Sequence, residues 1–132
     1  MEQKICLDTD VLITFLRNKK EEVKFILEQE ERNEITTTYI NLFELYYGAY
    51  KSKEQQKNLE AVNLIIDRIT ILNLTLLSVK KAGEILAQLE REGEKVDFRD
   101  ILIGTIALLH NCILKTNNTK HFSKIEGLKL VQ

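Results

Sequence analysis

Proline is absent from the 132 residues of the chain, and glycine occurs only five times. Helix and strand ends must therefore be set mainly by Asn, Thr, Asp and runs of charge. No Pro- or Gly-rich linker, internal repeat or low-complexity tract separates one part of the chain from another. Because this length is enough for one hydrophobic core and too short for two, we expect residues 1–132 to form a single domain.

Long apolar runs are also missing. None approaches the ~20 residues that span a bilayer, and no basic segment followed by an apolar stretch marks a signal peptide. The two cysteines, Cys6 and Cys112, lie in apolar surroundings without Cys-x-x-Cys spacing. This predicts buried free thiols rather than zinc ligands, and such thiols suit a reducing compartment. We therefore expect a soluble, cytoplasmic protein.

The chain has no strong excess of either charge. Nineteen Lys and Arg residues nearly balance twenty Asp and Glu residues, for a net charge of −1. A protein that binds nucleic acid by electrostatics alone is usually strongly basic. A nucleic-acid function here would therefore need local basic patches or a bound cation that offsets the acids.

Short apolar runs alternate along the chain with segments whose apolar residues recur at helical spacing. The expected strands are Lys4–Leu7, Ile35–Thr38, Ile69–Leu72, Cys112–Leu114 and Leu128–Val131. The expected helices are Asp10–Arg17, Glu21–Arg32, Asn41–Tyr50, Glu54–Asp67, Leu76–Arg91 and Phe98–His110, the last apolar nearly all round, as in a fully buried helix. This order predicts an α/β fold with a mostly parallel sheet that is covered on both faces.

Acidic residues follow the ends of these elements, where open α/β sheets bind ligands. Asp8 comes directly after the first strand and is either the N-cap of the next helix or a functional carboxylate. Glu44 shares a helix face with Asn41 and lies beside the apolar stripe, so it is either a site residue or a solvated one. Both interpretations remain open from spacing alone.

A second group of polar residues lies toward the C-terminus. Asp97 as N-cap and Asp100 three residues later resemble a loose capping box at the start of the most apolar helix, which competes with a functional role. Asn117 and Asn118 follow the strand Cys112–Leu114 and suggest a turn.

Asp8, Glu44 and Asp100 would converge if the sheet is parallel. Converging carboxylates either raise a pKa or hold a cation. Oxygen ligands without a supporting His or Cys cluster indicate Mg²⁺ or Mn²⁺, and such a site suits phosphodiester hydrolysis.

Four blocks of the sequence, taken together, resemble the PIN-domain family and, within it, the VapC-type toxin ribonucleases of toxin–antitoxin pairs. The blocks are Ile5–Thr9, Glu44–Ala49, Asp100–Ala107 and Leu114–Phe122. The resemblance covers nearly the whole chain. It implies a three-layer α/β/α fold and an Mg²⁺- or Mn²⁺-dependent endoribonuclease that is usually homodimeric and held inactive by a cognate antitoxin.

The resemblance also assigns roles to residues. Asp8, Glu44 and Asp100 match the family's metal-binding acids, and Asp8 or Asp100 would orient or deprotonate the attacking water. The fourth acidic position corresponds to Asn118, whose amide adds no charge, so a second metal would depend on Asp97 or Asp10. Thr116 matches a threonine that hydrogen-bonds a carboxylate or a water.

Several other residues have weaker signals. Neither histidine is expected to be catalytic: His110 is expected to end a helix, and His121 lies close enough in sequence to the site to contact RNA. Lys115, Lys120, Lys124 and Arg99 are candidates for phosphate contacts or for ordinary surface charge.

We expect a homodimer in which the region Leu42–Leu64 takes part, because this region carries more apolar side chains than one small core needs. These side chains are Tyr46, Tyr47, Tyr50, Leu59, Val62 and Leu64, together with the neighbouring Ile65. Tyr46 and Tyr47 are expected in the core or the dimer contact.

Two alternatives compete with the nuclease. Asp8-Thr9-Asp10-Val11 after an apolar strand also fits the nucleophile motif of haloacid-dehalogenase-type phosphatases, in which the first Asp is phosphorylated. That fold is usually longer, and Asp97 and Asp100 open a helix instead of following a strand. The second alternative is a catalytically inactive PIN-like binding module, which Asn118 at an acidic position favours.

Overall fold

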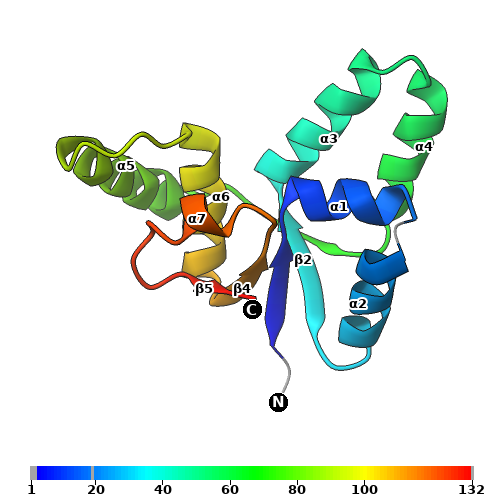
Figure 1. Cartoon of the computed structure of the whole chain (residues 1–132), viewed down its shortest axis with the longest axis horizontal. Helices are drawn as coiled ribbons and strands as arrows, with labels where there is room; N and C mark the ends of the chain where they lie inside the picture. The colour runs from blue at the N-terminus through cyan, green and yellow to red at the C-terminus, as the bar shows by residue number, and fades with distance from the viewer. Residues whose placement is uncertain (1–2, 19, 132) are drawn as a thin grey trace.

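Figure 1 shows the computed structural model of the chain, which describes residues 3–18 and 20–131. Within these residues, five strands form one sheet in the order β3-β2-β1-β4-β5, and every neighbouring pair is parallel. The strands are β1 (Lys4–Leu7), β2 (Glu34–Thr38), β3 (Thr70–Leu72), β4 (Cys112–Lys115) and β5 (Lys129–Leu130). The expected α/β fold with a parallel sheet is confirmed.

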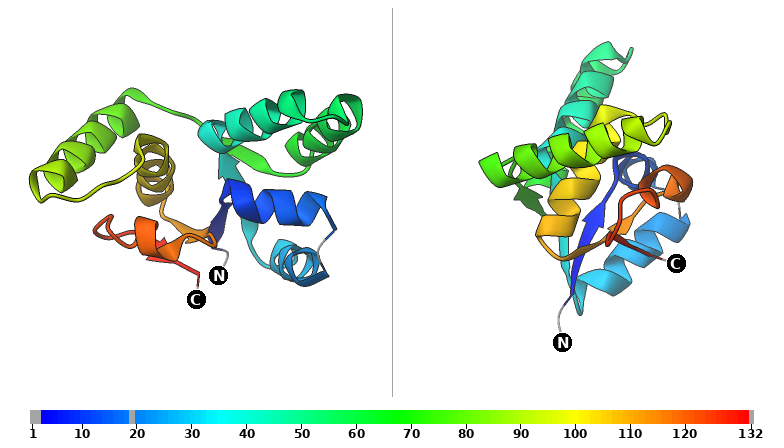
Figure 2. Two further views of the ribbon diagram at one scale, coloured as in Figure 1. Left: turned by 45° about the horizontal axis from the view of Figure 1, so that its top comes forward. Right: turned by 90° about the vertical axis from the view of Figure 1, so that its left-hand side faces the viewer.

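Seven helices occur in the described ranges. They are α1 (Thr9–Leu16), α2 (Lys20–Glu30), α3 (Tyr39–Lys51), α4 (Gln55–Ile66), α5 (Leu76–Arg91), α6 (Phe98–Leu109) and α7 (Thr119–Phe122). Side chains alternate across β1, so that Ile5 and Leu7 join a core with α1 to α4, while Cys6 joins a core with α5 to α7. Figures 1 and 2 show the resulting three layers, with the α3–α4 hairpin rising beyond the strands.

Helix α5 begins and ends where the sequence predicts. Thr75 and Ser78 form a capping box at its start. At its end, the backbone N–H groups of Gly93 and Glu94 bond the carbonyls of Glu90 and Leu89. Gly93 has φ +82°, a conformation that favours glycine and lets the chain reverse.

Three expectations need correction. No helix was expected after Asn117 and Asn118, but α7 begins at Thr119, directly after the bend there; four residues are too few to show a helical period. Helix α6 is not buried all round: Phe98 is 60% exposed, since the first turn of α6 extends beyond the carboxyl ends of the strands (Figure 1). In the region assigned to a dimer surface, Val62 and Ile65 are buried in the core instead, with Tyr46 and Leu59 packed against them.

The remaining expectations about the core hold. Cys6 and Cys112 are buried free thiols on adjacent strands, and burial raises the pKa of both. His110 is the C-cap residue of α6. No helix in the described ranges is long and apolar enough to cross a membrane.

Helix α6 and the segment that contains α7 approach each other closely at Gly104. A Cβ at Gly104 of α6 would collide with the side chain of Ile125 and press against Phe122. The absence of a side chain at Gly104 therefore lets the segment after β4 pack directly on α6. This contact holds Asn118 and His121 near the start of the helix.

Candidate functional site

The strand order changes direction between β1, the central strand, and its neighbour β4, because the chain continues from β1 to β2 on one side and from β4 to β5 on the other. Ligands bind at such switch points, outside the carboxyl ends of the strands. Asp8 follows β1, and Thr116 follows β4. The backbone N–H of Asp8 bonds the carbonyl of Lys115 at 2.9 Å, which holds the two strand ends side by side.

The Asp8 carboxylate is buried and held by three donors. The side chains of Thr116 and Asn41 donate to its two oxygens at 2.7 and 3.0 Å, and the backbone N–H of Thr9 donates at 2.9 Å. The last bond makes Asp8 the N-cap of α1, so the capping interpretation is confirmed. Capping uses one oxygen only, while Thr116 fixes the other.

Glu44 is tied to the same network through Thr9. The Thr9 hydroxyl donates to Oε1 of Glu44 at 2.8 Å, and the amide of Asn41 donates to that hydroxyl at 2.9 Å. Burial raises the pKa of Glu44, the Thr9 hydrogen bond lowers it, and the negative charge of Asp8 raises it further.

Asn41 is a site residue that the sequence interpretation did not assign. It is fully buried, and its amide bridges Asp8 and Thr9 while its oxygen accepts from Thr38. The only sequence signal is its spacing, one helical turn before Glu44. A buried Asn on an otherwise apolar helix face points to such a bridging role.

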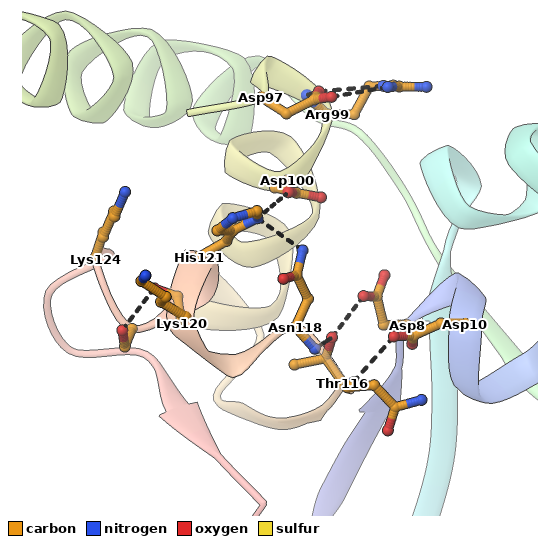
Figure 3. A network of polar contacts seen from close by, with 12 residues as sticks. Asp8, Asp10, Asp97, Arg99, Asp100, Thr116, Asn118, Lys120, His121 and Lys124 are labelled. Atoms are coloured by element: carbon orange, nitrogen blue, oxygen red, sulfur yellow. Dashed lines mark hydrogen bonds and ion pairs between the residues drawn. The ribbon is translucent and has the colours of Figure 1, made fainter. Parts of the chain in front are cut away.

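Asp100 lies on the first turn of α6, facing the Asp8 side of the site (Figure 3). Asp97 caps the helix by accepting from the N–H of Arg99, as expected, but no reciprocal capping-box bond from Asp100 is found in the described residues. Burial first, and then the charge of Asp8, raise the pKa of Asp100 to about 6. His121 Nδ1 lies 3.8 Å from Asp100 Oδ2.

Asp97 is engaged by Arg99. The guanidinium donates to both Asp97 oxygens at 3.1 and 2.8 Å, which lowers the pKa of Asp97. The same guanidinium lies 3.9 Å from Oε2 of Glu44. Figure 3 shows Asp97 and Arg99 at the outer end of α6, apart from Asp8. The structure therefore gives Asp97 an ion-pair partner on the rim of the site.

The loop after β4 faces Asp10 and α7. Oδ2 of Asp10 accepts from the N–H of Asn117 at 3.1 Å, whereas Oδ1 is buried with no hydrogen-bond donor in the described structure. Burial and the charge of Asp8 raise the pKa of Asp10. The N–H of Asn118 bonds the Thr116 hydroxyl at 3.0 Å, so Asn118 is attached to the group that holds Asp8.

The expected basic residues differ in their availability. The Lys115 ammonium lies over the Phe25 ring at 4.9 Å, and Lys124 pairs with Glu94 at 3.0 Å. Arg99 is likewise held by Asp97 and lies near Glu44. Lys120 is exposed on α7, and among these four cations it alone has no ion pair or ring contact in the described residues.

The donor set fits a hard divalent cation. Across residues 3–18 and 20–131, no three Asp, Glu, His or Cys side chains converge closely enough to hold one ion by themselves. The Asp8 charge nevertheless raises the pKa of Asp10, Glu44 and Asp100, and one Asp10 oxygen lacks a donor. A cation with oxygen ligands would relieve both the repulsion and the unsatisfied oxygen.

Comparison with known proteins agrees with this geometry. A PIN domain model matches residues 5–128. The chain is 33% identical over 128 residues to the tRNA(fMet)-specific endonuclease VapC of Shigella flexneri, covering 96% of this chain and 95% of the relative. It is 30% identical over 125 residues to the ribonuclease VapC2 of Rickettsia felis, covering 94% and 93%.

Solved structures show the same fold. VapBC2 from Rickettsia felis, bound to a DNA fragment from its promoter, superposes with a TM-score of 0.91 at 27% identity, covering 98% of both chains. DNA-bound VapBC from Salmonella typhimurium superposes with a TM-score of 0.88 at 30% identity, covering 98% and 97%. The similarity extends over the whole sheet and all three layers.

Proposed function

The chain belongs to the PIN domain family, and we propose that it is a divalent-metal-dependent endoribonuclease that acts as the toxin of a toxin–antitoxin pair. The observation that carries this proposal is the placement of Asp8, Glu44 and Asp100 around the switch point of the sheet, where the charge of Asp8 raises the pKa of the other two carboxyl groups. With the family known, the phosphatase alternative based on Asp8 is set aside.

We propose that Asp8 and Asp100 hold the cation, with Glu44 completing its surroundings and with Mg²⁺ or Mn²⁺ as the ion. The bound cation supplies positive charge to the phosphodiester and lowers the pKa of water, so that water becomes a nucleophile. Thr116 and Asn41 keep the Asp8 carboxylate in one orientation by donating to both of its oxygens. Arg99 neutralises the rim formed by Asp97 and Glu44.

Asp100 would also act on the attacking water. In the metal-free protein the pKa of Asp100 is raised to about 6, and a bound cation would lower that pKa again. The position of Asp100 on the first turn of α6 opposite Asp8 fits a role in orienting or deprotonating the attacking water.

The nuclease proposal is tested with purified protein and structured RNA. Because two relatives are named tRNA(fMet)-specific endonucleases, initiator tRNA is the first substrate to try, with an elongator tRNA beside it. We expect cleavage that EDTA abolishes and that Mg²⁺ or Mn²⁺ restores, with Asp8→Asn inactive. Full activity in EDTA would contradict the metal mechanism, and no cleavage under any metal would favour the inactive binding module.

The toxin proposal has its own readout. VapBC structures contain a toxin with its antitoxin, and we propose a cytoplasmic, homodimeric chain that a cognate antitoxin inhibits. A mainly apolar hollow between α1, α3 and α4, lined by residues such as Leu16, Leu45 and Ala61, borders Glu44 and offers a surface for that partner. Expression of the wild type should stop bacterial growth, whereas expression of Asp8→Asn should not. Equal growth of both strains at equal protein levels would contradict this role.

A further inference from the structure

Besides the acids already described, His121 of α7 points into the site. Its Nδ1 atom lies 2.8 Å from the amide nitrogen of Asn118 and 3.8 Å from Oδ2 of Asp100. Figure 3 shows the imidazole between these two side chains. The chain has two histidines, and the other, His110, caps the opposite end of α6.

The contact with Asn118 defines what Nδ1 can do. In this arrangement the NH₂ group of Asn118 donates and Nδ1 accepts, so the lone pair of Nδ1 lies on the side of the site. An imidazole nitrogen with a lone pair and a carboxylate oxygen are both common ligands of divalent transition-metal ions.

The separations allow both groups to reach one ion. Metal–nitrogen and metal–oxygen bonds are each about 2.0–2.2 Å long, so two ligands of one ion lie at most about 4.4 Å apart. The 3.8 Å between Nδ1 and Oδ2 falls within this limit. The side chain of His121 is 52% exposed, so it is free to adjust when an ion replaces the amide hydrogen.

We propose that His121 is a nitrogen ligand of the catalytic cation, and that the site therefore prefers transition-metal ions such as Mn²⁺ and Co²⁺ to Mg²⁺. This inference rests on the proposed function and modifies the oxygen-only site expected from the sequence. Imidazole favours the later divalent transition metals, whereas Mg²⁺ strongly prefers oxygen. Asn118 carries no charge, so His121 supplies the donor that the missing fourth acid would have provided.

The experiment measures metal affinity without RNA. The wild type, His121→Ala and the control His110→Ala are titrated with Mg²⁺, Mn²⁺ and Co²⁺ in a calorimeter, and the Co²⁺ complexes are examined by absorption spectroscopy. We expect the wild type and His110→Ala to prefer Mn²⁺ and Co²⁺ to Mg²⁺ by roughly tenfold or more. His121→Ala should lose most of this preference, since loss of a metal-site group typically costs 10–100-fold in affinity, and its Co²⁺ spectrum should change.

A third variant changes the metal-binding group at residue 121 instead of removing it. His121→Glu restores an oxygen donor at the same place and should raise the affinity for Mg²⁺ relative to Co²⁺. If His121→Ala weakens all three ions equally or leaves them unchanged, His121 is not a ligand, and the inference fails while the nuclease proposal stands. If the wild type binds none of the three ions, the proposed metal-dependent function fails as well.

Discussion

The hydroxyl of Thr116 donates a 2.7 Å hydrogen bond to Oδ2 of Asp8, although 108 residues separate the two in sequence. Both side chains are buried, and they extend from neighbouring parallel strands whose carboxyl ends meet at this edge. Thr116 therefore fixes the orientation of the carboxylate on which the rest of the site depends.

Replacing Thr116 with Val should impair the site without removing any acid. Val leaves one Asp8 oxygen and the N–H of Asn118 without a partner, and a buried polar group that loses its bond costs about 1–3 kcal/mol. We expect a lower free energy of unfolding by about that amount and a 10–100-fold loss of RNA cleavage. Thr116→Ser keeps the hydroxyl and should retain most of both. Equal activity of the Val and Ser variants would contradict a positioning role.

Asp100→Asn should abolish cleavage while leaving the metal-free protein as stable as the wild type, or slightly more so. The change removes one of the like charges that repel Asp8. Thermal melts with and without Mn²⁺ distinguish a metal-binding role of Asp100 from a capping role, because the loss of a cap would lower the free energy of unfolding by up to about 1 kcal/mol. A ligand at a hundredfold excess over its Kd stabilises by about 2.7 kcal/mol, and the variant should gain clearly less than the wild type. The same Mn²⁺ response in both would exclude Asp100 as a ligand.

The stability of the metal-free protein should depend on pH through Asp100. Its pKa is raised from 3.8 to about 6, so between these pH values the folded protein binds more protons than the unfolded chain. The contribution of Asp100 to stability is therefore full below about pH 4, falls as the pH rises to 6, and is constant above that. Urea unfolding in EDTA at several pH values should show a flatter profile for Asp100→Asn. Parallel profiles would contradict the raised pKa.

Asn118→Asp should act in the opposite direction to Asp100→Asn. The new carboxylate joins a pocket that already contains Asp8 and Asp100, so the metal-free protein should melt at a lower temperature than the wild type. Cation binding should become tighter, because a charged oxygen replaces an amide. Melting curves with and without Mn²⁺ measure both effects. An unchanged melting temperature without metal would place Asn118 outside the acidic pocket.

Dimerisation should depend on the exposed face of α3. Phe43 and Tyr47 are 62% and 57% exposed and stack on each other with ring centres 6.4 Å apart. Tyr47→Glu would place a charge in such a contact, so it should shift the protein from dimer to monomer in sedimentation at micromolar concentration. Leu27→Glu, at another exposed apolar position on α2, serves as the control. A wild type that is already monomeric would contradict the dimer.

Much of the fold follows from local sequence. Short apolar runs and helical spacing predicted all five strands and six of the seven helices within a few residues, because each buried element repeats its own pattern. Helix α7 and the burial of Val62 and Ile65 did not follow, since four residues show no period and an apolar stripe does not reveal what covers it.

The sequence by itself determined which acids were candidates: Asp8 directly follows a strand, Asp100 lies in the first turn of a helix, and Glu44 lies beside the apolar stripe within another helix. The tertiary structure alone decided their environment. Asn41 and Thr116 reach Asp8 from other elements, Asp97 is taken by Arg99, and His121 lies beside Asp100. Local periodicity reports which face of an element is buried, but hydrogen bonds and charge repulsion depend on distances between elements that meet only when the sheet forms.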